Sequence, residues 1–280
     1  MQQTWFITGA SSGFGRAFAL HALARGHNVV AAARRTDKLA EIEARAPDRV
    51  LAVTMDVTQP DQIAAGIADV EARFGRIDVL INNAGYGIVG AVEETDEASL
   101  RAMMETNFFG AVAVTQAALP LMRAQRSGTI VMVSSLGGQM SFAGFGPYSA
   151  SKFALEGLTE ALAQEIAPFG LKALIVEPGA FRTDFAGASG MKAMPEIAAY
   201  AEVVGPTRDF AAGMHGAQPG DPARAAEALE RALTAECPPL RLALGADAVD
   251  AIRDHAEAVL AELARWEDVA RDTVLADAAA

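Results

Sequence analysis

Short runs of apolar residues alternate along the chain with longer segments in which apolar residues recur at helical spacing. The short runs predict buried strands over residues 5–8, 29–33, 50–55, 77–81, 130–133, 171–176 and 240–244. The longer segments predict helices over residues 14–25, 39–46, 60–74, 97–122, 148–167, 222–234 and 247–272. Strands that alternate with helices in this way indicate an α/β fold, a doubly wound parallel sheet of about seven strands with helices on both faces.

The pattern shows neither a linker nor an internal repeat, so we expect a single domain over residues 1–280. Residues 1–183 form its regular core and residues 221–280 a helix–strand–helix extension at the C-terminal end. The intervening residues 184–220 are rich in glycine and proline but carry aromatic and methionine side chains. They predict an irregular substrate lid over an apolar pocket, and the alternative is a surface excursion that buries its own apolar residues.

Composition narrows the classes of function. Hydrophobic residues make up 51% of the chain and charged residues 21%, which is typical of a globular protein. The formal net charge of −12 argues against nucleic acid or an anionic membrane as a partner. The single cysteine, Cys237, excludes an internal disulfide, and no Cys/His cluster predicts a metal site. The start Met1-Gln2-Gln3 lacks the basic residues of a signal peptide, so we expect a cytoplasmic protein.

A glycine-rich turn follows the first predicted strand and opens the first helix. It reads Thr8-Gly-Ala-Ser-Ser-Gly-Phe-Gly15, with spacing that differs from the GxGxxG dinucleotide fingerprint. Glycines allow close approach of the backbone to a ligand, and a helix start attracts phosphate. The serines either donate to that phosphate or cap the helix. The residues expected to hold a phosphate here are Gly9, Ser11, Ser12, Gly13, Phe14 and Gly15.

Two arginines, Arg34 and Arg35, stand at the end of the second strand, just before a helix. Cations are unfavourable at a helix N-terminus, and an anionic ligand such as the 2′-phosphate of NADP(H) would explain them. We therefore expect NADP(H) rather than NAD(H), the alternative being that both side chains are solvated. The ends of the third and fourth strands are expected to line the same crevice, the third meeting the adenine, through Asp56, Val57, Asn83, Ala84 and Gly85.

Tyr148 and Lys152 are four residues apart at the start of a predicted helix, so they lie on one face of it. A neighbouring ammonium favours the phenolate, which would bring the pKa of Tyr148 closer to neutrality. Such a tyrosine can give or take a proton. The alternative is an exposed pair whose lysine is solvated.

Taken in order, these motifs resemble those of the short-chain dehydrogenase/reductase family over residues 4–183. The matching features are TGASSGFG at 8–15, Asp56-Val57, NNAG at 82–85, Asn107, Ser135, Tyr148 with Lys152, and Pro178-Gly179. The resemblance implies a Rossmann-type fold and hydride transfer between a nicotinamide and a carbonyl or alcohol.

The resemblance also implies a catalytic set. Tyr148 would be the general acid/base, Lys152 would lower its pKa and hold the nicotinamide ribose, and Ser135 would bond the substrate oxygen. Asn107 would support a water that links Lys152 to solvent as a proton relay. In this family a basic residue at the position of Arg34 goes with NADP(H). The residues implied on the nicotinamide side are Pro178, Gly179, Phe181 and Thr183.

Residues 178–185 and the C-terminal extension resemble the hydroxysteroid- and retinol-dehydrogenase-like branch, which implies a fairly apolar ketone or alcohol. The expected walls of the substrate pocket are Met140, Phe142, Phe145 and Phe185. Family members commonly pair through the helices holding Asn107 and Tyr148, which implies a homodimer or homotetramer and leaves a monomer open. Two other functions stay open, a dinucleotide-binding sensor without turnover and a non-redox enzyme on the same fold.

Overall fold

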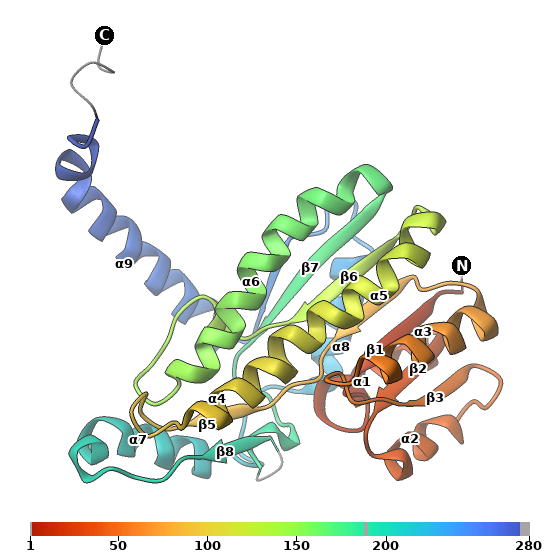
Figure 1. Ribbon diagram of the computed structural model, residues 1–280, viewed down its shortest axis with the longest axis horizontal. Helices are drawn as coiled ribbons and strands as arrows, with labels where there is room; N and C mark the ends of the chain where they lie inside the picture. The colour runs from red at the N-terminus through yellow and green to blue at the C-terminus, as the bar shows by residue number, and fades with distance from the viewer. Residues whose placement is uncertain (1, 188–189, 275–280) are drawn as a thin grey trace.

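The computed structural model describes residues 2–187 and 190–274 and builds the chain around one parallel sheet (Figure 1). Its strands are β1 (Thr4–Thr8), β2 (Asn28–Ala33), β3 (Val50–Thr54), β4 (Val79–Asn82), β6 (Gly128–Val133), β7 (Leu171–Pro178) and β9 (Arg241–Leu244). The strand order is β3-β2-β1-β4-β6-β7-β9, and every pair in it is parallel. The predicted fold class is confirmed. Because the order reverses between β1 and β4, the carboxyl ends of these strands open a crevice for a ligand.

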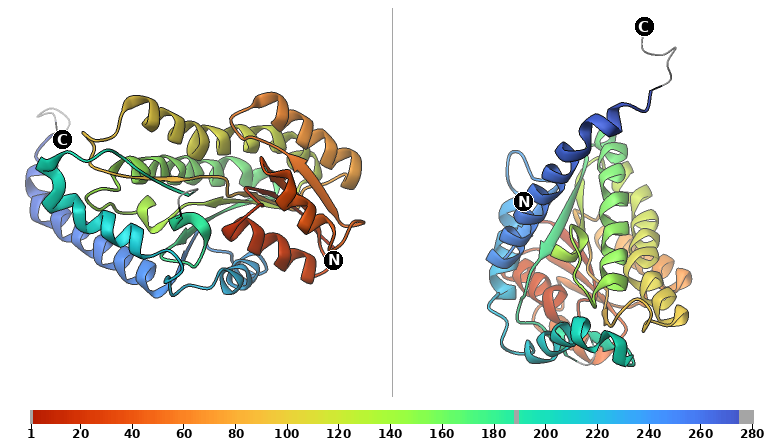
Figure 2. Two further views of the ribbon diagram at one scale, coloured as in Figure 1. Left: turned by 90° about the horizontal axis from the view of Figure 1, so that it is seen from below. Right: turned by 90° about the vertical axis from the view of Figure 1, so that its left-hand side faces the viewer.

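Alternation along the strands gives the sheet two apolar faces. On β1, Trp5 and Ile7 face one layer while Phe6 faces the other. The first layer holds α1 (Gly13–Ala24), α2 (Thr36–Glu43) and α8 (Pro222–Leu233). The second holds α3 (Pro60–Phe74), α5 (Gly110–Gln125) and α6 (Gly146–Ile166) (Figures 1 and 2). Covering both faces leaves the strand ends as the accessible part of the sheet.

The prediction of one continuous helix over residues 97–122 is wrong in one respect. The structure has α4 (Glu97–Met104), a π-helical turn over Glu105–Phe109, and then α5. A π turn inserts one extra residue per turn and is found mostly at functional positions. This turn contains Asn107, which is 1% exposed. Apolar spacing alone could not reveal the turn, because the flanking helices keep their own periodicity.

The segment 184–220 is more regular than its sequence indicates. It contains β8 (Met191–Ala193) and α7 (Ala201–Gly213), and Pro206 lies inside that helix. β8 pairs with β5 (Gly87–Val89), a strand that the sequence pattern did not predict. Residues 188–189 of this segment lie outside the described residues. The resulting two-stranded sheet fastens the segment beside the carboxyl ends of the main strands.

The last helix, α9 (Ala246–Arg271), begins against the sheet and then runs away from the rest of the molecule (Figures 1 and 2). Ala248 in its first turn is fully buried, whereas the residues from Ala256 to Arg271 are exposed. Among the described residues, no helix combines the length and apolar character needed to cross a bilayer.

Candidate functional site

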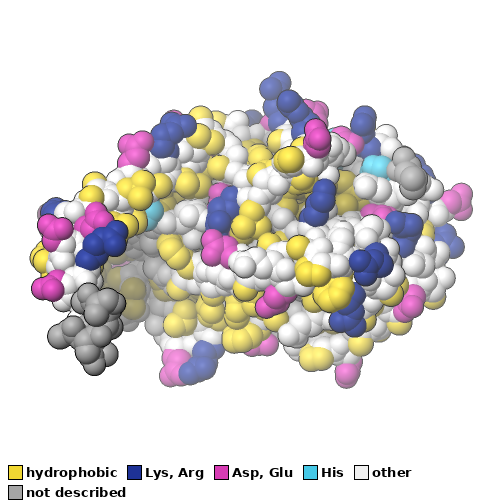
Figure 3. Space-filling model, turned by 90° about the horizontal axis from the view of Figure 1, so that it is seen from above, with side chains coloured by type: hydrophobic (Ala, Val, Ile, Leu, Met, Phe, Trp, Pro, Cys, Tyr) yellow, Lys and Arg dark blue, Asp and Glu magenta, His cyan; other side chains and the backbone are white. Residues whose placement is uncertain are grey.

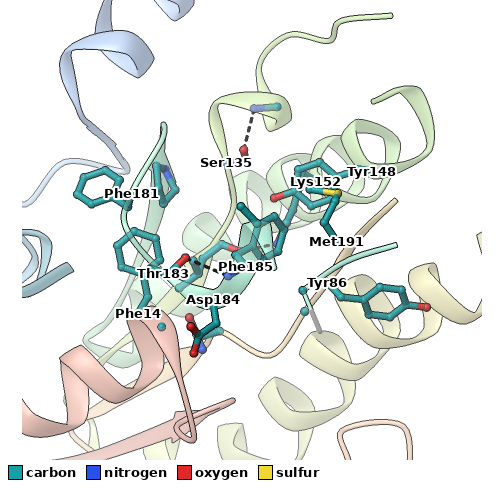
Figure 4. A pocket seen from close by; sticks show the side chains of 18 of the residues that line it. Phe14, Tyr86, Ser135, Tyr148, Lys152, Phe181, Thr183, Asp184, Phe185 and Met191 are labelled. Carbon is teal, nitrogen blue, oxygen red and sulfur yellow. Dashed lines mark hydrogen bonds between the residues drawn. The ribbon is translucent and has the colours of Figure 1, made fainter. Parts of the chain in front are cut away.

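A cavity of about 870 Å³ lies at the carboxyl ends of the central strands, between the glycine-rich turn and the segment 184–220 (Figure 4). Most of the residues predicted for the site line it. They are Gly9, Ser11, Ser12, Gly13, Phe14, Arg34, Arg35, Asp56, Val57, Asn83, Ala84, Gly85, Ser135, Phe142, Phe145, Tyr148, Lys152, Pro178, Gly179, Phe181, Thr183 and Phe185. Gly15 and Asn107 stand behind the cavity wall, and Met140 is not part of the wall.

The glycine-rich turn has a backbone that only glycine fits. Gly9 has φ +66, and a Cβ there would lie 2.8 Å from the Asn83 amide nitrogen. A Cβ on Gly15 would lie 2.4 Å from the carbonyl oxygen of Gly9, which explains why this glycine is needed without touching the cavity. Asn83 fixes the turn because its Nδ2 donates to the carbonyls of Thr8 (3.0 Å) and Gly9 (3.3 Å).

The start of α1 suits an anionic group. Ser12 is the N-cap residue, yet its side chain makes no capping hydrogen bond, so its hydroxyl remains available at the cavity. The positive end of the helix dipole points to the same place. A turn with this backbone, opening a helix into the cavity, fits the pyrophosphate of a dinucleotide.

The two arginines after β2 differ in their contacts. Arg35 donates from Nη2 to Ser11 Oγ at 3.2 Å, which links it to the glycine-rich turn. The Arg34 side chain is 79% exposed, and its one ion pair, to Asp56 Oδ2, is 3.9 Å long. Such a long exposed pair holds a side chain weakly. Arg34 can therefore turn towards a phosphate at the rim of the cavity.

Ser135, Tyr148 and Lys152 meet at the other end of the cavity (Figure 4). Ser135 follows β6, and the other two lie in the first turns of α6, which Pro147 helps to begin. The Ser135 hydroxyl accepts the Gly137 N–H at 3.1 Å, and a Cβ on Gly137 would lie 3.4 Å from Ser135 Oγ and 3.6 Å from the Tyr148 ring. The Lys152 Nζ donates to the Val133 carbonyl at 2.8 Å and lies 5.8 Å from the centroid of the Tyr148 ring.

The expected lowering of the Tyr148 pKa is wrong for the protein alone. Desolvation raises the pKa of Tyr148 to about 12, with the nearby Ser135 hydroxyl opposing the rise. Burial also lowers the pKa of Lys152 to about 8, while nearby Glu156 opposes that shift. The physical reason is that the protein atoms packed around both groups disfavour both charged forms, and this outweighs the attraction between them. Tyr148 consequently holds its proton at neutral pH.

Asn107 uses its whole carboxamide on neighbouring protein groups. Its Nδ2 donates to the Tyr86 carbonyl (2.8 Å) and to Ser151 Oγ (3.1 Å), and its Oδ1 accepts the Tyr86 N–H at 3.0 Å. The π turn brings this side chain to the segment that follows β4. A Cβ on Gly85 would lie 3.0 Å from Asn107 Oδ1 and 3.8 Å from Lys152 Nζ. Gly85 therefore lets the amide and the ammonium approach each other.

Two buried carboxyl groups lie behind Lys152. Glu156, one turn further along α6, and Glu177 on β7 are only 4% and 2% exposed. Gln139 Nε2 donates to both (3.2 and 2.9 Å), and Arg241 Nε lies 3.0 and 3.4 Å from them. Burial and the Glu156 charge raise the pKa of Glu177 to about 7. Through Gln139 and Arg241 the carboxyl pair ties the loop after Ser135 to β7 and β9.

The end of the cavity around Tyr148 is lined by apolar side chains. The Tyr148 ring lies 5.8 Å from the Phe185 ring and 6.4 Å from the Phe145 ring, centroid to centroid. Sequence reasoning missed part of this wall, although Phe210 and Met214 are among the apolar residues of the predicted lid. The lining residues that were not predicted include Tyr86, Leu136, Asp184, Met191, Phe210, Met214, Asp247 and Ala251.

An ion pair fastens this wall to the body of the protein. Arg208 of α7 donates from Nη2 to Glu94 Oε2 at 2.6 Å and from Nη1 to the Met194 carbonyl at 2.8 Å. Glu94, before α4, also accepts the N–H groups of Ala91 and Ile197. The two charged side chains are 2% and 12% exposed. The segment 184–220 is therefore anchored through one desolvated carboxylate, and we call this Glu94–Arg208 pair the lid anchor.

Comparisons with known proteins agree with this geometry. A sequence profile described as short chain dehydrogenase matches residues 3–193. The chain is 39% identical over 270 residues to oxidoreductase BOA17 of Botryotinia fuckeliana, covering 96% of this chain and 98% of that protein. A solved short-chain dehydrogenase from Streptomyces avermitilis is 53% identical, with a TM-score of 0.93, covering 98% of this chain and 100% of that one.

Two solved structures with this fold carry a dinucleotide. A short chain dehydrogenase from Burkholderia cenocepacia in complex with NADP is 26% identical, with a TM-score of 0.74, covering 95% of this chain and 98% of that one. One from Burkholderia phymatum in complex with NAD is 24% identical, with a TM-score of 0.83, covering 93% of this chain and 95% of that one. Proteins of this fold therefore bind either nicotinamide dinucleotide.

Proposed function

Since the chain belongs to the short-chain dehydrogenase family of oxidoreductases, we propose that it is an NADP(H)-dependent enzyme acting on a carbonyl or secondary alcohol, with Tyr148 as general acid/base. A nicotinamide dinucleotide is the cofactor that its relatives indicate. The observation that carries the proposal is a single cavity with a glycine-rich phosphate turn at one end and the Ser135–Tyr148–Lys152 group at the other.

Each residue at the Tyr148 end of the cavity has its own role in this reaction. When bound, the nicotinamide supplies or accepts the hydride. Tyr148 donates its proton to the carbonyl oxygen in reduction and takes it back from the alcohol in oxidation. Ser135, which lines the cavity together with Tyr148, holds the substrate oxygen. Lys152 places its ammonium on the Tyr148 side of the cavity, where it stabilises negative charge on the phenol oxygen, and Asn107 fixes the backbone beside it.

The preference for NADP(H) rests on Arg34 and Arg35. Both side chains line the cavity next to the turn expected to hold the pyrophosphate. Arg35 is bonded to Ser11, and the weak ion pair of Arg34 leaves its guanidinium free to bind a 2′-phosphate. One carboxylate oxygen of the nearby acidic residue, Asp56 Oδ1, accepts both the N–H and the hydroxyl of Thr58.

The substrate we propose is a fairly apolar small molecule, as in the hydroxysteroid- and retinol-dehydrogenase-like branch. Support comes from the aromatic rings beside Tyr148 and from the apolar side chains that β8 and α7 add to the wall. A cytoplasmic homodimer or homotetramer remains our expectation for the protein as a whole.

A screen of ketones and alcohols, steroids and retinoids included, tests this function through the absorbance of NADPH and NADH. We expect turnover with NADPH or NADP⁺ and an apolar carbonyl–alcohol pair. Tight cofactor binding with no turnover on any of them would favour a dinucleotide sensor instead. Turnover of an apolar compound without any change in nicotinamide absorbance would favour a non-redox enzyme.

A further inference from the structure

The free part of α9 carries an apolar stripe that the described residues leave uncovered. Its base packs on the sheet, where Asp247 Oδ2 accepts the Ala180 N–H at 2.7 Å. Beyond the base, the helix continues into solvent for sixteen residues, Ala256–Arg271, or about 24 Å. In Figure 3, hydrophobic side chains lie among charged ones on this projecting end, next to the grey terminal residues. The exposed fractions are 50% for Val259, 63% for Leu260 and Leu263, 58% for Trp266 and 63% for Val269.

The stripe has the spacing of a helix-pairing seam. Ala256, Val259, Leu263, Trp266 and Ala270 follow one another at alternating steps of three and four residues. This is the a/d repeat by which one helix packs against another. The opposite side of the free helix carries small or charged residues, Glu257, Ala258, Ala261, Ala264, Arg265 and Asp268. The free part of α9 is therefore built to meet one helical partner along one face.

The charge of α9 argues against a lipid surface as that partner. Acidic residues outnumber arginines along the helix, and they flank the stripe as well as the outer side. Helices that lie on membranes usually carry lysine and arginine on their polar face. An acidic helix would be repelled by anionic lipids. A protein helix of complementary shape and charge is the better occupant.

We propose that this helix is α9 of a second copy of the chain, packed antiparallel about a two-fold axis. The axis lies level with residue 261 and passes beside the two Leu260 side chains, which flank the seam. In that register small side chains face large ones, because Ala256 lies opposite Trp266 of the second copy and Val259 opposite Leu263. Leu260 meets its own counterpart at the axis. A two-fold pair makes each of the first two contacts twice, as in any isologous interface.

Charges outside the seam agree with the same register. Arg253 of one copy lies opposite Glu267 of the other, at both ends of the pair. Within one helix these side chains are held by exposed ion pairs, Arg253 with Asp250 and Glu267 with Arg271, which are weak enough to exchange. A parallel pair would instead place Trp266 on Trp266 and leave Ala256 facing Ala256, a poor match of volumes.

The mass of the full-length protein in solution, measured by light scattering or sedimentation, tests the pair. Leu263→Asp places a charge in the seam and is expected to halve the mass of the assembly. Ala264→Asp, its neighbour on the outer side, is the matched control and should leave the mass unchanged. Cofactor binding should be retained in both variants, since the free part of α9 lies away from the cavity. An unchanged mass for Leu263→Asp would overturn the proposal.

A charge exchange tests the register and its antiparallel direction. Arg253→Glu and Glu267→Arg should each weaken association, whereas the double variant should restore the wild-type dissociation constant. Failure of the double variant to restore it would contradict this register. Glu262 lies close to its counterpart on the other flank, so Glu262→Gln should tighten the pair. A wild-type protein that stays monomeric and binds phosphatidylcholine vesicles through α9 would replace the second copy with a lipid surface.

Discussion

Lys152 and Tyr148 show how burial sets the proton chemistry of single residues. Protein atoms crowd both side chains, and for each the uncharged form gains at the expense of the charged one. A protonated Tyr148 is suited to donate to a developing alkoxide. A lysine whose pKa has fallen to about 8 is still mostly charged at neutral pH. The buried ammonium therefore lowers the stability of the folded protein.

Lys152→Met should make the protein more stable and less active at the same time. The pKa of Lys152 is lower in the folded chain, so the buried charge destabilises the fold fully below about pH 8. Removing it should raise the free energy of unfolding by about 3 kcal/mol at pH 7. The gain should shrink as the pH rises from 8 towards 10.5. Urea unfolding at pH 7 and 10 measures it, and equal gains at both values would contradict the assignment.

Arg34→Ala should separate the two cofactors. Losing one charge-assisted hydrogen bond to a phosphate should weaken NADPH binding about 10- to 100-fold. NADH lacks that phosphate, so its affinity should change little. Calorimetric titration of both cofactors measures the difference. Arg45→Ala, an exposed arginine that does not line the cavity, is the control. Equal losses of affinity for both cofactors would contradict the assignment of Arg34 to the 2′-phosphate.

Residue roles of this kind were only partly predictable. Tyr148, Lys152 and Ser135 could be found from spacing and resemblance, because sequence distance fixes their places on one helix and one strand end. The pKa of Tyr148 could not be predicted from the sequence, because it depends on how many atoms of other elements surround the ring. Met140 was placed in the pocket wall by its apolar character. The turn after Leu136 directs the wall through Phe142 and Phe145 instead.

At the scale of elements, the carboxyl pair joins α6, β7 and β9 behind the site. Glu177 has a raised pKa in the folded chain, so its stabilising proton is fully held below about pH 4.5 and is lost as the pH rises through about 7. Above pH 7 two buried carboxylates face one Arg241 guanidinium, with Lys152 on one side and exposed Glu160 on the other. Repulsion between them should then loosen the loop that carries Ser135.

Glu177→Gln should flatten this dependence. The wild-type protein should lose about 2 kcal/mol of stability between pH 5 and 8, and the variant should lose much less, since an amide does not titrate. Chemical unfolding at several pH values checks the slope. Glu160→Gln is the matched control, because that residue also bonds Arg241 but is 53% exposed. A variant slope as steep as the wild-type slope would show that the proton is held elsewhere.

The lid anchor predicts local rather than global loosening. Arg208→Met leaves Glu94 charged and desolvated, which should cost about 3 kcal/mol in the segment that it fastens. Hydrogen exchange should accelerate in residues 194–213, while the strands of the main sheet keep their protection. Lys192→Ala is the control, because it removes an exposed contact with Ser99 in the same segment. If hydrogen exchange in residues 194–213 accelerates equally in both variants, Glu94 does not anchor this segment.

Three elements, α7, β5 and β8, could not be predicted from the apolar pattern of the sequence. α7 was hidden because Pro206, Gly205 and Gly213 are poor helix formers, and its contacts with Glu94 and Ala143 outweigh their low propensity. β5 and β8 are only three residues long and gain stability from pairing across more than a hundred residues of sequence. Helix and strand periodicity is local, so neither could appear in it.

At the scale of the whole molecule, the sheet order, the cavity and the projecting helix are linked. The reversal between β1 and β4 opens the crevice, α6 brings Tyr148 and Lys152 to the cavity, and residues of the segment 184–220 line its other side. The main sheet could be predicted because each buried strand is a continuous apolar run. The course of α9 away from the body could not, since an amphipathic pattern says that a helix has a partner and not where that partner lies.

The general acid/base role of Tyr148 is the central claim, and the Tyr148→Phe variant tests it most directly. Single-turnover reduction of an identified ketone should be measured with saturating NADPH, alongside the affinity for the cofactor. We expect the rate to fall by about 10²–10⁴-fold, because the proton donor is lost. Cofactor affinity should change little, because the glycine-rich turn and Arg34 are untouched. A rate within a few-fold of the wild-type rate would contradict the mechanism.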